Sequence, residues 1–324
     1  MRRREFTTLL GGAVVAWPLG AHAQLADSSP KIGLLWPGDS PPVSPRMESF
    51  RQGLRASGFI DGQNIGIELR YAQRGPQQLP ELAAELARLK VDAMFAGGDL
   101  AARVAHQATE TIPIISISDD ILGAGLIASL SRPGGNVTGV TILAPELSAK
   151  RLEILRDIIP GLSRVTALYD PTNGPSQVKM TEVAARSPNV KLQVLEVKHR
   201  DDVAGAIRTA RDSQADAVNV FFSPLLSSLH REIIAFTAEY RLPAIYQWKE
   251  HSEVGGLVSY GPNLAAMWRQ SAIIVGRVIK GANPADLPVE QPTKFELVVN
   301  FRTANSLGLT IPPSVLLRAD EVIE

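Results

Sequence analysis

From Lys31 onward, short apolar runs alternate with stretches in which apolar residues recur at helical spacing. Parallel strands joined by crossover helices produce this alternation, so we predict an α/β fold. In the first half the expected strands are Lys31–Trp36, Ile65–Tyr71, Val91–Ala96, Ile112–Ile117 and Val137–Ile142. In the second half they are Arg164–Tyr169, Val190–Val197, Asp216–Phe222, Leu242–Tyr246 and Gly256–Tyr260.

The series of strands and helices occurs twice, with matching elements roughly 120 to 135 residues apart. A chain of 324 residues also exceeds the length at which one hydrophobic core usually keeps growing. We therefore predict two similar doubly wound parallel-sheet lobes, the first over 31–143 plus about 261–294 and the second over 144–260 plus about 295–324. A buried helix over 264–279 and a final strand over Phe295–Asn300 belong to no further βαβ unit, so we expect several crossings that form a hinge.

Residues 1–23 are predicted to be a signal peptide. Arg2, Arg3 and Arg4 precede an uncharged stretch, and Ala21-His22-Ala23 supplies a small-x-small cleavage site. The basic start fits both a twin-arginine signal and an ordinary secretory signal, so the export route stays open. The apolar stretch is only about 14 residues long, shorter than the ~20 residues that span a bilayer, which favours cleavage over anchoring.

The composition narrows the classes of chemistry and partner. The chain has no cysteine, which excludes disulfides, thiolate catalysis, cysteine metal sites and a lipid-anchored cysteine behind the signal. Basic and acidic residues number 33 each, and they become 30 and 32 without residues 1–23, a formal charge of −2. A near-neutral surface gives no electrostatic reason to expect nucleic acid or an anionic membrane as partner. With no obvious exposed apolar repeat, we expect a monomer.

Open parallel sheets bind ligands outside the carboxyl ends of their strands, where loops lead into helices. This rule selects loops in both expected lobes. In the first lobe the candidate ligand-binding residues are Trp36, Gly38, Asp39, Ser40, Gly98, Asp99, Ser118, Asp119 and Asp120. In the second lobe they are Asn173, Ser223, Gln247, Trp248 and Glu250. Because the two sets would face each other across a cleft, we predict a small-molecule site between the lobes.

The residue types in these loops suit a small polar ligand, although the same types also cap helices. Trp36 and Trp248 stand at strand ends, where an aromatic ring either stacks on a ligand or closes the core of its own lobe. Acidic side chains outnumber basic ones in the loops, which predicts a ligand with an amine. Lys249 and backbone N–H groups remain for a carboxylate, so an amino acid or a related compound fits.

Signals of catalysis are weak. Gly123–Ala128 matches the loose dinucleotide pattern GxGxx[GA], but it lies several residues beyond its strand and lacks the acidic residue expected about 20 positions later. The chain contains neither a GxxxxGK[ST] phosphate loop nor a GxSxG nucleophile elbow. Its histidines are scattered singly, without metal-ligand spacing. We therefore expect no catalytic residue, no metal and no cofactor.

Four segments resemble the ABC transporter substrate-binding family that includes tryptophan- and tyrosine-binding members. They are Ser49–Arg55, Gly62–Ile65, the glycine-rich Ser131–Val140 and the tail Ala304–Glu324. The likeness runs over almost the whole mature chain. It implies a type I periplasmic-binding-protein fold, export to the periplasm, no catalysis, and the permease and ATPase of an importer as partners. The family's ligand cleft lies at the loops selected above, and the turn Ile117–Asp120 is the best match among them.

The function expected on this basis is that of the exported solute-binding component of an ABC importer, which captures an amino acid or related compound. A ligand that touches both lobes favours the closed form of the hinge, and the importer would recognise that form. Two other functions stay open. One is a receptor that presents its ligand to a signalling partner, and the other, with less support, is an enzyme on the same two-lobed architecture.

Overall fold

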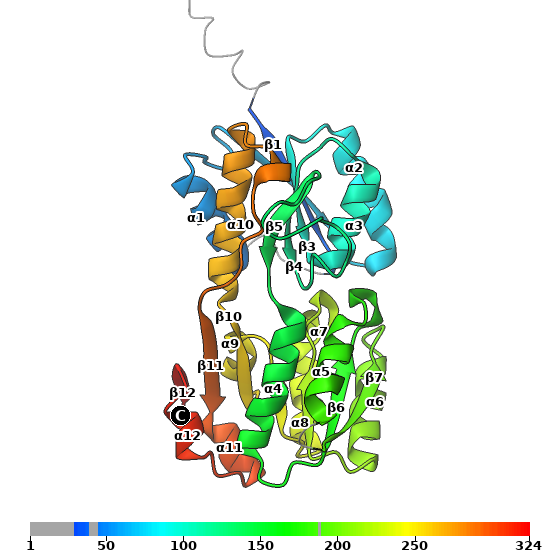
Figure 1. Ribbon diagram of the computed structural model, residues 1–324, viewed down its shortest axis with the longest axis vertical. Coiled ribbons are helices and arrows are strands. Elements are labelled where there is room, and N and C mark those ends of the chain that lie inside the picture. The colour runs from blue at the N-terminus through cyan, green and yellow to red at the C-terminus, as the bar shows by residue number, and fades with distance from the viewer. Residues whose placement is uncertain (1–28, 39–44, 187–188) are drawn as a thin grey trace, which may run out of the picture.

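The computed structural model describes residues 29–38, 45–186 and 189–324. Two α/β lobes follow one another along the long axis of the molecule, and each is built on its own sheet (Figure 1). The predicted signal peptide, residues 1–23, lies outside the described residues, and so do the candidate site residues Asp39 and Ser40. Across the described ranges, no helix combines the length and the hydropathy that a membrane crossing requires.

The first lobe has a five-stranded, all-parallel sheet with the strand order β2-β1-β3-β4-β5. Its strands are β1 (Lys31–Trp36), β2 (Gly66–Tyr71), β3 (Ala93–Gly97), β4 (Ile114–Ser118) and β5 (Val137–Thr141). The helices on one face are α1 (Pro45–Ala56) and α10 (Leu264–Ile279), and those on the other are α2 (Leu79–Arg88) and α3 (Gly98–Ala108). Successive residues of β1 divide between the faces, since Leu34 joins the core under α1 and α10 and Leu35 joins the core under α2 and α3.

The second lobe has a seven-stranded sheet with the order β12-β11-β10-β9-β8-β6-β7, in which only β10 and β11 pair antiparallel. Its strands are β6 (Arg164–Tyr169), β7 (Lys191–Glu196), β8 (Ala217–Val220), β9 (Ala244–Tyr246), β10 (Val258–Pro262), β11 (Phe295–Asn300) and β12 (Glu321–Ile323). One apolar core contains residues of α4 (Ala144–Ile158), α5 (Ser176–Arg186), α11 (Phe301–Leu307) and α12 (Pro313–Leu316). The other contains residues of α6 (Asp202–Asp212), α7 (Pro224–Ser228) and α8 (His230–Glu239), and α9 (Lys249–Glu253) precedes β10.

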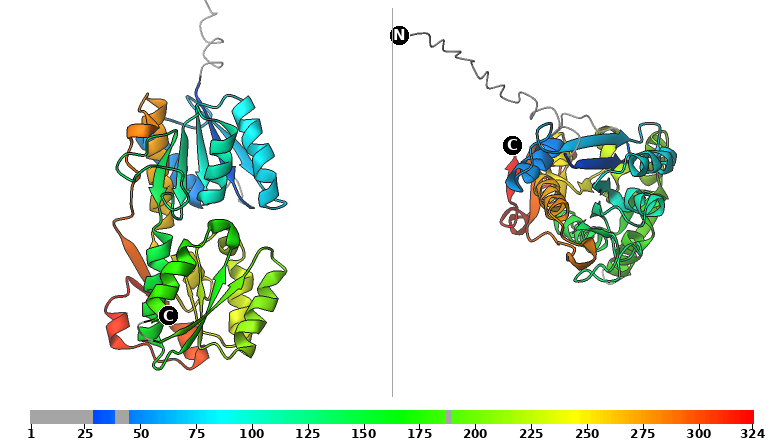
Figure 2. Two further views of the ribbon diagram at one scale, coloured as in Figure 1. Left: turned by 45° about the vertical axis from the view of Figure 1, so that its right-hand side comes forward. Right: turned by 90° about the horizontal axis from the view of Figure 1, so that it is seen from above.

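The chain crosses between the lobes after β5, after β10 and before β11. α10 follows a strand of the second sheet but packs against α1 of the first lobe, and β11 then returns to the second sheet. Thr141 N donates to Glu290 O at 2.9 Å and Thr138 Oγ1 donates to Leu287 O at 2.8 Å, which ties two of the crossing regions together. Figure 2 (left) shows the crossing segments gathered on one side of the molecule, as a hinge requires.

The strands expected from the sequence all form, each within two residues of its predicted ends. The prediction of two doubly wound parallel-sheet lobes is therefore confirmed. β12 was not expected, because its three half-exposed residues carry no apolar pattern and pair only with β11 at the edge of the sheet. Its partner strand, rather than its own sequence, makes it a strand.

Candidate functional site

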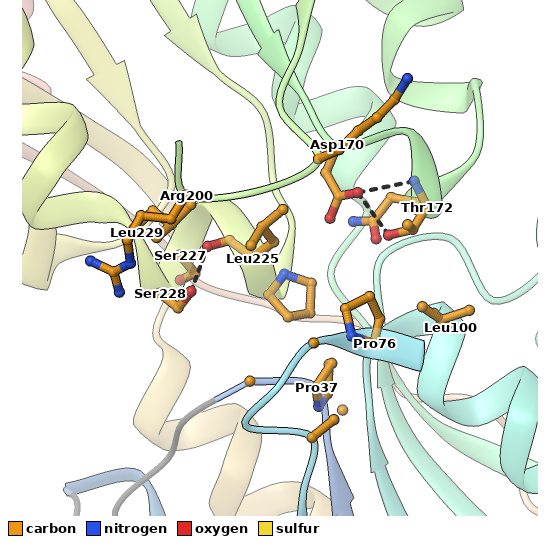
Figure 3. Close-up of a pocket in the computed structure, with 18 of the residues that line it drawn as sticks. Pro37, Pro76, Leu100, Asp170, Thr172, Arg200, Leu225, Ser227, Ser228 and Leu229 are labelled. Atoms are coloured by element: carbon orange, nitrogen blue, oxygen red, sulfur yellow. Dashed lines mark hydrogen bonds between the residues drawn. The ribbon is translucent and has the colours of Figure 1, made fainter. Parts of the chain in front are cut away.

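A cavity of about 390 Å³ lies between the two lobes, within the size range of small-molecule sites. Loops and helix starts of both lobes form its walls (Figure 3). Its larger apolar lining residues are Pro37, Pro76, Leu100, Pro224, Leu225 and Leu229. Its polar lining residues are Arg46, Gln73, Asp170, Thr172, Asn173, Lys198, Arg200, Ser227, Ser228 and His230. We call this space the interlobe cavity.

The lobes approach each other closely where α3 begins. Gly98 has a φ of +82°, and a Cβ atom built there would lie 3.0 Å from Cγ of Pro224 in the second lobe. A Cβ atom on Gly97 would overlap the ring of Trp36. Glycine at position 98 therefore lets the backbone of the first lobe contact a side chain of the second at the wall of the cavity, and glycine at position 97 leaves room for the Trp36 ring of its own lobe.

A side-chain hydrogen bond crosses the cleft beside the cavity. Asn173 Nδ2 donates to Asp119 Oδ2 in the first lobe, and also to Phe222 O at 2.9 Å. Asn173 belongs to the short 3-10 turn Pro171–Asn173 that follows β6, and Asp119 belongs to the turn that follows β4. The carboxyl ends of strands from two different sheets thus meet in one contact.

The turn that holds Asp119 is a buried acidic cluster. Asp99 at the start of α3 accepts hydrogen bonds from Ser118 Oγ, from Asp119 N at 3.1 Å and from Asp120 N at 3.2 Å. Asp119 is only 1% exposed, and its Oδ1 atom has no hydrogen-bond partner among the described residues. Burial, reinforced by the neighbouring Asp99 and Asp170, raises the pKa of Asp119 well above its ordinary value. Burial also raises the pKa of Asp99.

Basic and imidazole side chains gather at a different part of the cleft. Arg46, from the first turn of α1, lines the cavity together with His230 at the start of α8. The ring of His230 stacks on that of His251, with centroids 4.7 Å apart and planes inclined by 17°. Burial lowers the pKa of Arg46, and Glu250 of the second lobe acts in the opposite direction. Burial, with His230 and Arg46 nearby, holds the pKa of His251 well below its ordinary value.

A polar network beneath the cavity supports Asn173. Gln177 of α5 accepts a hydrogen bond from Phe222 N at 2.9 Å and donates one to Phe222 O at 2.8 Å, the carbonyl that Asn173 also contacts. Gln177 Oε1 accepts in addition from Ser148 Oγ of α4 at 2.8 Å. Arg151 Nη2 in turn donates to Ser148 Oγ at 2.9 Å. The first helix after the hinge is therefore connected by hydrogen bonds to the residue that reaches across the cleft.

The structure places the candidate residues selected from the sequence in different surroundings. Gly38, Gly98 and Asn173 line the interlobe cavity. Asp99, Ser118, Asp119 and Asp120 form the acidic turn, which is absent from the cavity lining although Asp119 bonds to Asn173. Ser223 caps α7 by accepting from Leu226 N at 2.8 Å, and Gln247 Nε2 donates to Val220 O at 2.6 Å. Glu250 is exposed and does not line the cavity.

Neither candidate tryptophan lines the cavity. The ring of Trp36 packs on that of Trp268, with centroids 4.8 Å apart, and so closes the core of the first lobe. Trp248 is 1% exposed, lies edge-on to Phe222 at 5.2 Å and donates from Nε1 to Ser227 Oγ at 3.1 Å. Of the two readings left open for these rings, the structure favours core closure.

Several lining residues were not among those selected. Asp170 directly follows β6, so the strand-end rule could have found it, but an aspartate there also caps the turn that follows. Arg46 and His230 lie in the first turns of α1 and α8, where nothing in the local sequence marks a side chain that faces a ligand. Leu225 and Leu229 resemble ordinary core positions of a helical stripe. These residues line the cavity because the other lobe lies opposite them, and the local sequence does not encode that arrangement.

The chain is similar in sequence and in structure to known proteins. The sequence profile of the family described as ABC transporter substrate binding protein matches residues 31–323. A tyrosine-binding protein of Clostridioides difficile (strain R20291) is 24% identical over 283 residues, which cover 86% of this chain and 81% of that protein. The crystal structure of an ABC domain from Streptococcus pneumonia in complex with L-Trp is 27% identical, with a TM-score of 0.84, and covers 91% of this chain and 100% of its own.

A second solved structure differs in how well it superposes. The ligand-free, open structure of a substrate-binding protein with adhesive properties from Clostridium difficile is 24% identical and covers 91% of this chain and 99% of its own, but its TM-score is 0.64. Identity and coverage are nearly the same as for the tryptophan complex.

Proposed function

The chain belongs to the ABC transporter substrate-binding protein family, and from this premise we propose that it captures an amino acid or a closely related compound in the interlobe cavity. The observation that carries the proposal is that side chains of both lobes enclose one cavity of about 390 Å³. The similarity to a tyrosine-binding protein and to a domain that binds L-Trp supports an amino acid as ligand.

The capture mechanism that we propose is closure about the hinge. The cavity is lined by residues of the first lobe, such as Arg46 and Leu100, and of the second, such as Asp170 and Leu225, which supports a closed form that holds the ligand between them. A ligand that contacts both sets therefore binds the closed form more tightly, and shifts the population toward it by the difference in affinity. The hydrogen bond between Asn173 and Asp119 joins the two lobes of the chain in that same form.

We further propose that the chain is exported to the periplasm, loses its first 23 residues and acts there as a monomer. Its partners are then the permease and the ATPase of an ABC importer, which take up the ligand from the closed form. The lobes extend over 31–143 with about 261–294, and over 144–260 with about 295–324. Family membership supports the transport role, and the basic start with its Ala-His-Ala site supports export.

A ligand screen tests this function. The chain from Gln24 onward is heated with amino acids, aromatic acids, purines and sugars. A ligand that binds only the folded state raises the free energy of unfolding by about 2.7 kcal/mol when its concentration is 100 times its Kd. We expect one chemical class to raise the unfolding midpoint, to be recovered unchanged, and to reduce the radius of gyration in solution scattering. A compound recovered chemically altered would support an enzyme instead. A folded protein that no class stabilises would contradict the proposal.

A further inference from the structure

Among the described residues, the charged groups that line the interlobe cavity and form no salt bridge lie on opposite lobes, the anion on one and the cation on the other. Asp170 is the acidic lining residue, and it belongs to the second lobe. Arg46 is the cation that the first lobe contributes. Lys198 and Arg200 also line the cavity, but both are well exposed and already paired, with Glu196 at 2.7 Å and with Glu232. Within the part of the chain that the structure describes, the charged lining groups without a salt bridge are therefore one carboxylate and one guanidinium, on opposite lobes.

Asp170 presents a free carboxylate oxygen to the cavity. Its Oδ1 atom accepts from Thr172 N at 3.0 Å and from Thr172 Oγ1 at 2.7 Å, which fixes the orientation of the carboxylate. Figure 3 shows these two bonds and the second oxygen directed into the cavity. The Asp170 residue is 3% exposed overall, so most of its surface is covered by protein. An ammonium group of a ligand can replace the missing hydrogen-bond donors.

Arg46 presents the complementary cation. It is half-buried and lines the cavity, and among the described residues it forms no salt bridge. The imidazoles beside it, His230 and His251, carry no negative charge, and the acidic group that acts on it is the exposed Glu250. A planar guanidinium is suited to bind a carboxylate through two parallel hydrogen bonds.

We propose that Arg46 and Asp170 recognise the two charges of a zwitterionic amino acid, with the carboxylate at Arg46 and the ammonium at Asp170. This inference rests on the proposed function and specifies its ligand. The apolar side chain then lies against the proline and leucine walls of the cavity, which include Pro76, Leu100 and Leu225. Because each charge is held by a different lobe, a compound that lacks either charge contacts one lobe less and favours closure less.

The test uses L-tyrosine and two analogues, each missing one charge. Tyramine lacks the carboxylate, and 3-(4-hydroxyphenyl)propionate lacks the amine. Calorimetric titration of the wild-type chain from Gln24 should give the tightest binding for L-tyrosine. Asp170→Asn should weaken the binding of L-tyrosine and of tyramine by about ten- to a hundredfold, as expected for the loss of one charge-assisted hydrogen bond. It should leave the affinity for 3-(4-hydroxyphenyl)propionate unchanged. Arg46→Gln should weaken the binding of L-tyrosine and of 3-(4-hydroxyphenyl)propionate, and should leave the affinity for tyramine unchanged.

Matched controls separate recognition from folding. Arg55→Gln changes an exposed cation of the same helix α1, and Asp212→Asn changes an exposed carboxylate of the second lobe. Both should keep the affinities of the wild type, and all four variants should keep its unfolding midpoint to within a few degrees. If Asp170→Asn or Arg46→Gln weakens the binding of all three compounds alike, or of none, the assignment of the two charges is wrong.

The outcome also distinguishes this inference from the function on which it rests. If the only solutes of the screen that bind the wild-type chain are not amino acids, the zwitterion assignment is wrong and solute capture stands. If no solute of any class binds the folded chain, both fall.

Discussion

Asn173 of the second lobe donates a hydrogen bond from Nδ2 to the buried carboxylate of Asp119 in the first lobe. Asn173 also lines the interlobe cavity, whereas Asp119 lies behind its wall. The bond joins residues of different lobes, so opening the hinge breaks it. The ligand capture proposed above and this contact would therefore favour the same form of the protein.

Replacing Asn173 by alanine should weaken ligand binding. The substitution removes the bond from the closed form and leaves the Asp119 carboxyl without that partner, at a cost of roughly 1.5–3 kcal/mol, which corresponds to about a ten- to hundredfold loss of affinity. Calorimetric titration with the ligand found in the screen measures the effect. Asn305→Ala, at an exposed position of α11, serves as control. Equal affinities for Asn173→Ala and the wild type would show that the bond does not favour closure.

The raised pKa of Asp119 predicts how stability depends on pH at this site. Between the ordinary aspartate pKa of about 3.9 and the higher value in the folded state, the folded protein binds a proton that the unfolded chain has lost. The contribution of Asp119 to stability is thus present below about pH 3.9 and is lost as the pH rises through the folded pKa. Asp119→Asn should remove this contribution to the dependence of the free energy of unfolding on pH. Denaturant unfolding of both proteins across this range measures it, and parallel curves would contradict the prediction.

His251 predicts a dependence of the opposite sign. Its folded pKa is held well below the ordinary value, so the unfolded chain takes up a proton below about pH 6.5 while the folded protein does not. Stability from this residue is present above about pH 6.5 and is lost as the pH falls through the folded pKa. His251→Gln should flatten the curve on the acid side. His199→Gln, at an exposed position, should reproduce the wild-type dependence.

Gly98→Ala should impair closure as well as stability. The backbone at Gly98 is left-handed, which costs a residue with a side chain roughly 1–2 kcal/mol, and the added methyl group meets Pro224 of the other lobe. We expect a lower unfolding midpoint and a weaker ligand affinity, with a larger radius of gyration in the presence of ligand. The control is Gly205→Ala in α6, where no atom lies within 4 Å of the new Cβ and helix propensity should add about 0.5–1 kcal/mol of stability. A full ligand affinity in Gly98→Ala would exclude the closure effect.

Much of the fold could be predicted from local patterns. Apart from β12, the strands of both sheets and the long helix α10 appear where apolar runs and helical stripes predicted them, because burial on one or both faces of an element leaves a periodic pattern in its own residues. The loops at the carboxyl ends of the strands were likewise the right region to search, since Gly38, Gly98 and Asn173 from those loops line the cavity.

The choice among the side chains of those loops depended on the tertiary structure. Trp36 and Trp248 turn into the protein, Ser223 caps a helix, and Asp170 both caps a turn and faces the cavity. Capping and ligand binding use the same residue types, so the local sequence cannot separate them. The sequence by itself determined the alternation of strands and helices and the pair of lobes. The placement of Arg46 and Asp170 in the lining of one cavity was decided only by the tertiary structure, because it requires two lobes, each with its own apolar core, to lie against each other.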